Sequence, residues 1–115
     1  MATNPIQSLP EWDRLLAACQ KNQPDAVRHL IKVEDVDPSH ANRVGQSALH
    51  VAALWGHVEC VKILLELGAD PHATNQITGA TPLHCAIQSS KAATIENRIE
   101  VVKLLLIQGK ADPGF

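Results

Sequence analysis

The chain repeats a nine-residue pattern at an offset of 34 residues. Residues 45–53 read Gly-Gln-Ser-Ala-Leu-His-Val-Ala-Ala, and residues 79–87 read Gly-Ala-Thr-Pro-Leu-His-Cys-Ala-Ile. The same offset extends into the N-terminal third, where Leu15 corresponds to Leu49. A fixed period of this length is typical of a solenoid, in which each unit buries its apolar face against the next. The repeat therefore predicts three stacked units.

Local patterns inside the repeat predict a pair of short helices in each unit. Thr81 is a suitable N-cap, and Pro82 suits the first position of a helix. A second helix is predicted over residues 58–67, where apolar residues recur at helical spacing. Gly68 and Gly109 are placed to end the second helices, because glycine readily adopts the left-handed conformation of a helix C-terminus. Such short helices are marginal alone, so the pairs must stack.

These residue types and this period resemble the ankyrin repeat family over nearly the whole chain. The Thr-Pro-Leu-His-x-Ala stretch at 81–86 is matched at the right distances by Gly-His-Val-Glu at 56–59 and Leu-Gly-Ala-Asp-Pro at 67–71. The resemblance implies an all-α solenoid of helix-turn-helix units with short β-hairpin loops.

We expect one domain over residues 1–115 that forms the N-terminal part of a longer protein. The sequence pattern predicts that a further hairpin opens at Asp112-Pro113, and no polar capping unit follows it. The apolar residues 104–107 would then be partly uncovered, which predicts weak self-association through the C-terminal face. The expected units span approximately residues 8–41, 42–74 and 75–115.

Two irregularities interrupt the repeat. The second hairpin carries one extra residue, which should bulge its tip around residues 76–78. The third unit carries seven extra residues within 89–98, since Val61 and Val102 are 41 residues apart. Apolar residues continue at helical spacing through the end of this insertion, so it should extend the second helix backwards. The rest of the insertion is either a partner contact or a loop elaboration.

The resemblance implies a protein–protein interaction module, which binds a partner protein or peptide through a concave face of hairpin tips and first helices. The alternative is a structural or regulatory segment that packs against another domain of the same chain. Leu54 and Trp55 stand out among the variable positions because Trp is enriched in binding hot spots; alternatively, Trp55 folds over the neighbouring unit. The predicted partner-binding residues are Arg43, Val44, Gln46, Leu54, Trp55, Gln76, Ile77, Thr78, Gln88 and Ser89.

The histidines and cysteines do not form a pattern typical of a catalytic or metal site. His50 and His84 lie three residues after a cap hydroxyl, and the resemblance implies that each imidazole bonds this hydroxyl and nearby hairpin backbone. The chain lacks Cys/His spacing for zinc, a nucleophile elbow and a phosphate loop. We therefore expect no enzyme, no catalytic residue, no metal and no cofactor. Cys19, Cys60 and Cys85 are expected to be reduced core thiols, which favours the cytoplasm or nucleus.

Charge and hydropathy argue against two classes of partner. The formal net charge is −2, with both signs interspersed, so no basic stripe is present for nucleic acid. The longest apolar run, residues 104–107, is far too short to cross a bilayer. We expect neither nucleic acid nor membrane as a partner.

His72 is a candidate hydroxylation site. Resemblance to ankyrin substrates of asparagine hydroxylases places His72 where the target asparagine usually lies, with Leu64 and Asp70 at the expected upstream spacing. Pro71 departs from the usual aliphatic residue. The alternative is an ordinary hairpin histidine.

Overall fold

The computed structural model describes residues 11–89, 91–92 and 94–111, and the side chains of residues 14–89, 91–92 and 94–107. Within these ranges the chain forms six α-helices and one isolated antiparallel bridge, between Ala41 and Ser47. The helices are α2 (Glu11–Gln20), α3 (Pro24–Lys32), α4 (Ala48–Trp55), α5 (Val58–Glu66), α6 (Pro82–Gln88) and α7 (Ile95–Ala111).

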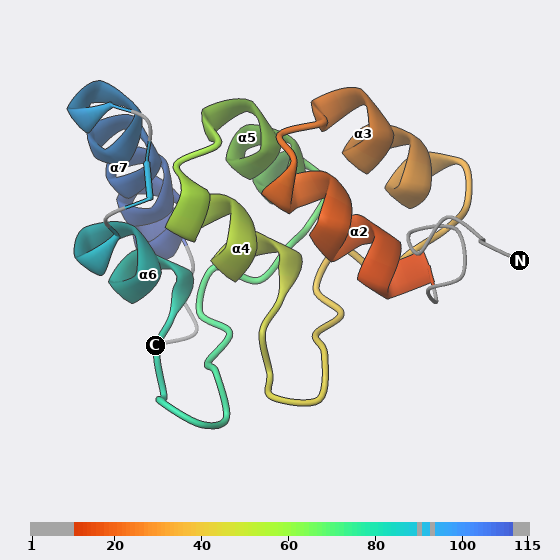
Figure 1. The fold of residues 1–115 in the computed structure, drawn as a ribbon, viewed down its shortest axis with the longest axis horizontal. Helices are drawn as coiled ribbons and strands as arrows, with labels where there is room; N and C mark the ends of the chain where they lie inside the picture. Colours follow the sequence, from red (N-terminus) through yellow and green to blue (C-terminus); the bar gives the residue numbers. More distant parts are fainter. Residues whose placement is uncertain (1–10, 90, 93, 112–115) are drawn as a thin grey trace, which may run out of the picture.

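The helices are arranged in two rows (Figure 1). Helices α2, α4 and α6 follow one another in one row, and α3, α5 and α7 follow one another in the second. The loops that lead into α4 and α6 project from the same edge of the molecule. We call residues 41–47 the first hairpin and residues 75–80 the second hairpin. This arrangement confirms the predicted all-α solenoid.

A single apolar core lies between the two rows. Leu15, Leu49 and Leu64 are completely buried, and each contributes roughly 1.5–3 kcal/mol relative to an exposed side chain. Alanines at the contacts between successive helices allow close approach, and Ala52 and Ala86 are also completely buried. Stacking therefore stabilises helices that are too short to persist alone.

The first helices of the second and third units begin where the sequence predicted. The hydroxyl oxygens of Ser47 and Thr81 accept hydrogen bonds from the backbone N–H groups of His50 and His84, at 3.3 Å in both cases. Pro82 follows Thr81 in the first helical position, where its missing N–H costs nothing. The predicted caps are confirmed.

The second helices end differently from one another. Helix α5 ends with Leu67 as its C-cap, and Gly68 follows with a φ of +101°, as predicted. The prediction that Gly109 ends the last helix is wrong, because α7 continues to Ala111. Glycine permits helical as well as left-handed backbone, at a cost of roughly 1 kcal/mol relative to alanine. The remainder of this 17-residue helix offsets that cost.

The insertion lengthens α7 and packs against α4. Helix α7 begins at Ile95, four residues before Ile99, which is the counterpart of the first residue of α5, Val58. The predicted backward extension is therefore confirmed, and it amounts to about one turn. Ala92 lies against the end of α4 at Gly56, which has a φ of +69°. A Cβ on Gly56 would come within 2.6 Å of the Ala92 Cβ, so glycine is required there.

Candidate protein-binding face

Asparagine side chains shape both hairpins. The Asn42 Oδ1 accepts hydrogen bonds from the backbone N–H groups of Val44 and Gln46, at 3.1 and 3.0 Å. The Asn75 Oδ1 accepts one from the N–H of Ile77 at 2.8 Å. Such bonds let the chain reverse over a few residues, because the side chain replaces a backbone acceptor. The hairpins are therefore locally defined by their own sequence.

The two hairpins are joined to each other. The backbone N–H of Gln76 donates to the carbonyl oxygen of Val44 at 2.8 Å. The Asn75 side-chain amide donates to the Gln46 Oε1 at 2.7 Å. A Cβ on Gly45 would lie only 2.8 Å from the backbone nitrogen of Gln76, so glycine allows the close approach. These contacts make one continuous surface from the two hairpins.

His50 fixes the second hairpin onto α4. Its Nδ1 accepts a hydrogen bond from the backbone N–H of Ser47 at 3.2 Å, so the Nε2 carries the proton of the neutral ring. The Nε2 then donates to the carbonyl oxygen of Ala80 at 2.9 Å. Burial lowers the pKa of His50, although hydrogen bonds to the Ala80 and Ala73 backbone oppose this shift. The predicted structural role of His50 is confirmed, and His84 makes the same cap contacts with Thr81.

A groove of about 510 Å³ lies between the second hairpin and helices α4 and α6. Four predicted partner-binding residues meet in it, namely Gln46, Leu54, Thr78 and Gln88. Leu54 supplies apolar surface, and the other three supply amide and hydroxyl groups. The groove therefore offers hydrogen-bonding groups around an apolar contact, which is the usual composition of a recognition site. Its remaining lining residues are Asn75, Gly79, Ala80, His84 and Cys85.

Most of the other predicted residues lie exposed on the hairpins. Arg43, Val44 and Gln76 are exposed, and Ile77 is 73% exposed at the tip of the second hairpin. The turn at residues 76–78 lies where the extra residue was expected to bulge the tip. An apolar side chain with this exposure is available to a partner.

Trp55 and Ser89 are engaged inside the chain instead. The indole of Trp55 is half-buried, stacks on the His57 ring at a centroid separation of 6.4 Å, and has the Lys91 ammonium 5.0 Å from its centroid. Ser89 is only 5% exposed, and its hydroxyl donates to the carbonyl oxygen of Leu54 and accepts from the Lys91 N–H. The insertion supplies Lys91 and Ser89 to these contacts, because it folds back over the end of α4.

Sequence reasoning missed Asn75, His84 and Cys85 as lining residues of the groove. His84 was expected to bond the cap hydroxyl, and Cys85 was expected to be a core thiol. His84 and Cys85 reach the groove because they lie four and three residues before Gln88, so all three share a face of α6. Burial raises the pKa of the Cys85 thiol, which is nonetheless only half-buried.

The titratable side chains of the described residues do not gather into a metal site. Within the described ranges, no three His, Cys, Asp or Glu side chains come close enough to hold a metal ion. Cys19, Cys60 and Cys85 are free thiols. None of the helices in the described ranges is long and apolar enough to span a membrane.

His72 lies in the turn that follows α5. Its backbone N–H donates to the Asp70 Oδ1 at 2.8 Å, and its side chain is half-buried. The turn resembles those at Asn42 and Asn75, in which a side-chain oxygen also accepts a hydrogen bond from the backbone N–H two residues later. His72 therefore lies outside the groove, on the chain that leads to the second hairpin.

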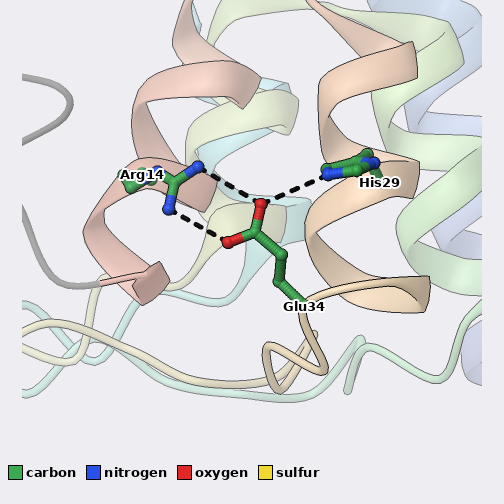
Figure 2. A network of polar contacts seen from close by, with 3 residues as sticks. All are labelled: Arg14, His29 and Glu34. Atoms are coloured by element: carbon green, nitrogen blue, oxygen red, sulfur yellow. Dashed lines mark hydrogen bonds and ion pairs between the residues drawn. The ribbon is translucent and has the colours of Figure 1, made fainter.

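A separate polar network joins the first two helices (Figure 2). The Arg14 guanidinium of α2 makes two contacts with the Glu34 carboxylate, at 3.1 and 3.3 Å. The His29 Nε2 of α3 lies 3.3 Å from the same carboxylate. The Arg14 and Glu34 side chains are about one-third exposed, so solvent screens the pair and limits its worth to about 1 kcal/mol or less. We assign this network to the packing of α2 on α3.

Comparison with known proteins identifies relatives of this fold. The family described as "Ankyrin repeats (3 copies)" matches residues 15–114. The B-cell lymphoma 3 protein homolog of Mus musculus is 35% identical over 95 residues, which cover 80% of this chain and 20% of that protein. Protein phosphatase 1 regulatory subunit 27 of Mus musculus is 42% identical over 62 residues, 54% of this chain and 40% of that protein. Protein PhlB of Serratia liquefaciens is 38% identical over 74 residues, 64% of this chain and 32% of that protein. The chain thus spans less than half the length of each of these relatives.

Proposed function

Because the chain belongs to the ankyrin repeat family, we propose that it binds a partner protein through its concave face. Ankyrin repeats are generally protein–protein interaction modules, and the family is a non-enzymatic fold. We define the concave face by the exposed hairpin residues and the groove residues beside them. It comprises Arg43, Val44, Gln46, Leu54, Gln76, Ile77, Thr78 and Gln88.

The groove is the observation that carries this proposal. Residues from the first hairpin, the second hairpin, α4 and α6 converge there, although they are far apart in the sequence. The hydrogen bonds from His50 and Asn75 hold these elements together before any partner arrives. A preformed site loses less conformational entropy on binding, which favours affinity. Trp55 and Ser89 stand outside this face because their contacts lie within the chain.

The concave face favours a partner segment that is apolar and hydrogen-bonding. Ile77 and Leu54 offer apolar contact, while Gln46, Thr78 and Gln88 offer amide and hydroxyl groups. An extended peptide suits this arrangement, since its backbone N–H and carbonyl groups can pair with side-chain amides. Charges of both signs are interspersed along the chain, which argues against nucleic acid as the partner. The free thiols favour the cytoplasm or nucleus as the compartment.

A second candidate function is packing against another domain or another copy of the chain. A groove of about 330 Å³ between α6 and α7 favours it. Ile87, Ile95, Ile99 and Val102 line this groove, together with Arg98 and Lys103. All three of these isoleucines are about half or more exposed, which is costly unless another surface covers them.

Arginine substitutions at two positions of similar exposure, one on the concave face and one away from it, test the proposal. Ile77→Arg alters the second hairpin tip, and Val33→Arg alters the end of α3, where Val33 is 67% exposed. Proteins captured by the wild-type chain should be retained by Val33→Arg and lost by Ile77→Arg. Purified candidates should then show the same difference in Kd by calorimetry. Equal binding by wild-type protein and both variants would refute the concave face as the binding site.

A further inference from the structure

The groove between the second hairpin and helices α4 and α6 is built from segments that carry almost no charge. Arg43 is the only Lys, Arg, Asp or Glu residue within 41–56 and 75–89, although the whole chain has ten basic and twelve acidic residues. Arg43 lies exposed on the first hairpin. A partner that binds to these segments therefore meets one positive charge and no carboxylate, which favours a negatively charged partner group.

A series of hydrogen bonds determines which atom of the Gln46 amide is available in the groove. The backbone N–H groups of Ile77 and Thr78 donate to the Asn75 side chain at 2.8 and 3.3 Å, so the accepting atom is its oxygen. The Asn75 amide nitrogen then donates to the Gln46 Oε1 at 2.7 Å. This bond occupies the Gln46 oxygen. The Gln46 amide nitrogen keeps an N–H group for a partner.

Two further residues of the groove are hydrogen-bond donors for the same reason. The Thr81 backbone N–H donates to the His84 Nδ1 at 3.2 Å, so the proton of the neutral ring lies on Nε2. In His50 the same nitrogen bonds the Ala80 carbonyl oxygen, whereas in the exposed His84 it has no such partner among the described residues. The Ala80 N–H donates to the Thr78 Oγ1 at 3.2 Å, which leaves the hydroxyl hydrogen to be donated.

We propose that the groove binds an aspartate or glutamate side chain of the partner segment, an inference that rests on the proposed function. The Gln46 Nε2, the Thr78 hydroxyl and the His84 Nε2 are donors that line one groove. A carboxylate offers two oxygens with about four acceptor positions, whereas a backbone carbonyl offers one oxygen. Hydrogen bonds to an ionised acceptor are also roughly twice as strong as those between neutral groups. A carboxylate therefore matches both the three donors and the positive charge of Arg43.

A peptide array probed with the whole chain tests the proposal. The probes are random decapeptides with acetylated N-termini and amidated C-termini, so every carboxylate belongs to an Asp or Glu side chain. Peptides that bind wild-type protein and are lost by Leu54→Ala define the groove binders, because Leu54 lines the groove. We expect one acidic residue to recur at a fixed position in these peptides. Its replacement by the corresponding amide should raise the Kd about five- to tenfold.

An isosteric substitution in the protein examines the same contact from the other side. Gln46→Glu keeps an oxygen for Asn75 but replaces the donor nitrogen with a second carboxylate oxygen. It should weaken the acidic peptides about five- to tenfold and leave their amide counterparts nearly unchanged. Gln23→Glu is the matched control, since Gln23 is exposed at the start of α3, away from the concave face. It should change either Kd by less than about twofold, because solvent and salt screen a distant surface charge.

Several results would overturn the proposal while the proposed function stands. These are groove binders without a recurrent acidic residue, an unchanged Kd after the acid-to-amide exchange in the peptide, and equal weakening by Gln46→Glu and Gln23→Glu. If no bound peptide is sensitive to Leu54→Ala or Ile77→Arg, the concave face is not the binding site, and both proposals are wrong. The exchange in the peptide uses wild-type protein, so this readout does not depend on the folding of Gln46→Glu.

Discussion

The His50 imidazole links α4 to the second hairpin, since its Nε2 lies 2.9 Å from the carbonyl oxygen of Ala80. The same ring also closes the capping box at Ser47. One completely buried side chain therefore holds a helix start and the neighbouring hairpin together. Because the groove lies between that hairpin and helices α4 and α6, its shape depends on this contact.

Replacement of His50 by alanine should destabilise the fold substantially. The change leaves the Ala80 carbonyl oxygen and the buried Ser47 N–H without their present partners, and it opens a cavity in the core. We expect a loss of about 2–4 kcal/mol in the free energy of unfolding, measured by urea denaturation followed by circular dichroism. His84→Ala is the matched control, because its ring makes the same cap contacts but is exposed. A loss no larger than that of the control would contradict the role given to His50.

Stability should also fall with acidification because of His50. Burial lowers the pKa of His50 in the folded state below its ordinary value of 6.5. Below that value the unfolded chain binds a proton that the folded chain does not, so the free energy of unfolding decreases as the pH falls toward the folded-state pKa. Thermal melts at a series of pH values between about 7 and 5 measure this slope, in the range where histidine titrates. The His50→Ala variant should have a flatter profile, and an identical slope would assign the effect to other groups.

The sequence predicted the features that recur at the repeat period. The caps at Ser47 and Thr81, the role of His50 and the stop at Gly68 all follow from local chemistry that recurs between units. Gly109 failed as a helix stop because glycine permits a turn without enforcing one.

Contacts made by non-repeating residues could not be predicted in the same way. The insertion places Lys91 over the Trp55 ring and buries Ser89, so both residues make contacts inside the chain. The conformation of a loop depends on its tertiary contacts. The repeat spacing therefore located the insertion in the sequence but could not predict the course of its backbone.

Trp55 should contribute to stability more than to partner binding. Its ring stacks on His57 and lies beneath the Lys91 ammonium, which favours the folded-over arrangement left open by the sequence. Trp55→Ala should therefore lower the Tm, and a double-mutant cycle with Lys91→Gln should give a coupling of about 0.5–1 kcal/mol. Leu54→Ala, in the groove, should weaken partner binding more than Trp55→Ala does. Zero coupling with unchanged stability would return Trp55 to the list of surface contacts.

Hydroxylation of His72 is a separate prediction, which rests on its position after Asp70. We expect an asparagine hydroxylase that accepts ankyrin histidines to add one oxygen to this side chain. Intact-mass measurement after incubation with the enzyme detects the increment, and fragmentation assigns it to the peptide that contains His72. The His72→Ala variant should gain no mass. An unmodified wild-type chain, under conditions that modify a known ankyrin substrate, would remove His72 as a site.

The face formed by α6 and α7 should support weak self-association. Ile95 is 72% exposed and Ile107 64% exposed, and Ile99 and Leu106 are each about half exposed on the same helix. Covering such apolar surface is worth roughly 25 cal/mol per Å², so a second copy that contacts this face should be held weakly at high concentration. Light scattering across a concentration series should show the mean mass rising. Ile99→Lys should suppress this rise, whereas Val33→Lys, at the end of α3 and at the opposite end of the helix rows, should not (Figure 1). A constant monomer mass at every concentration would show that the isoleucines of α7 do not bind a second copy.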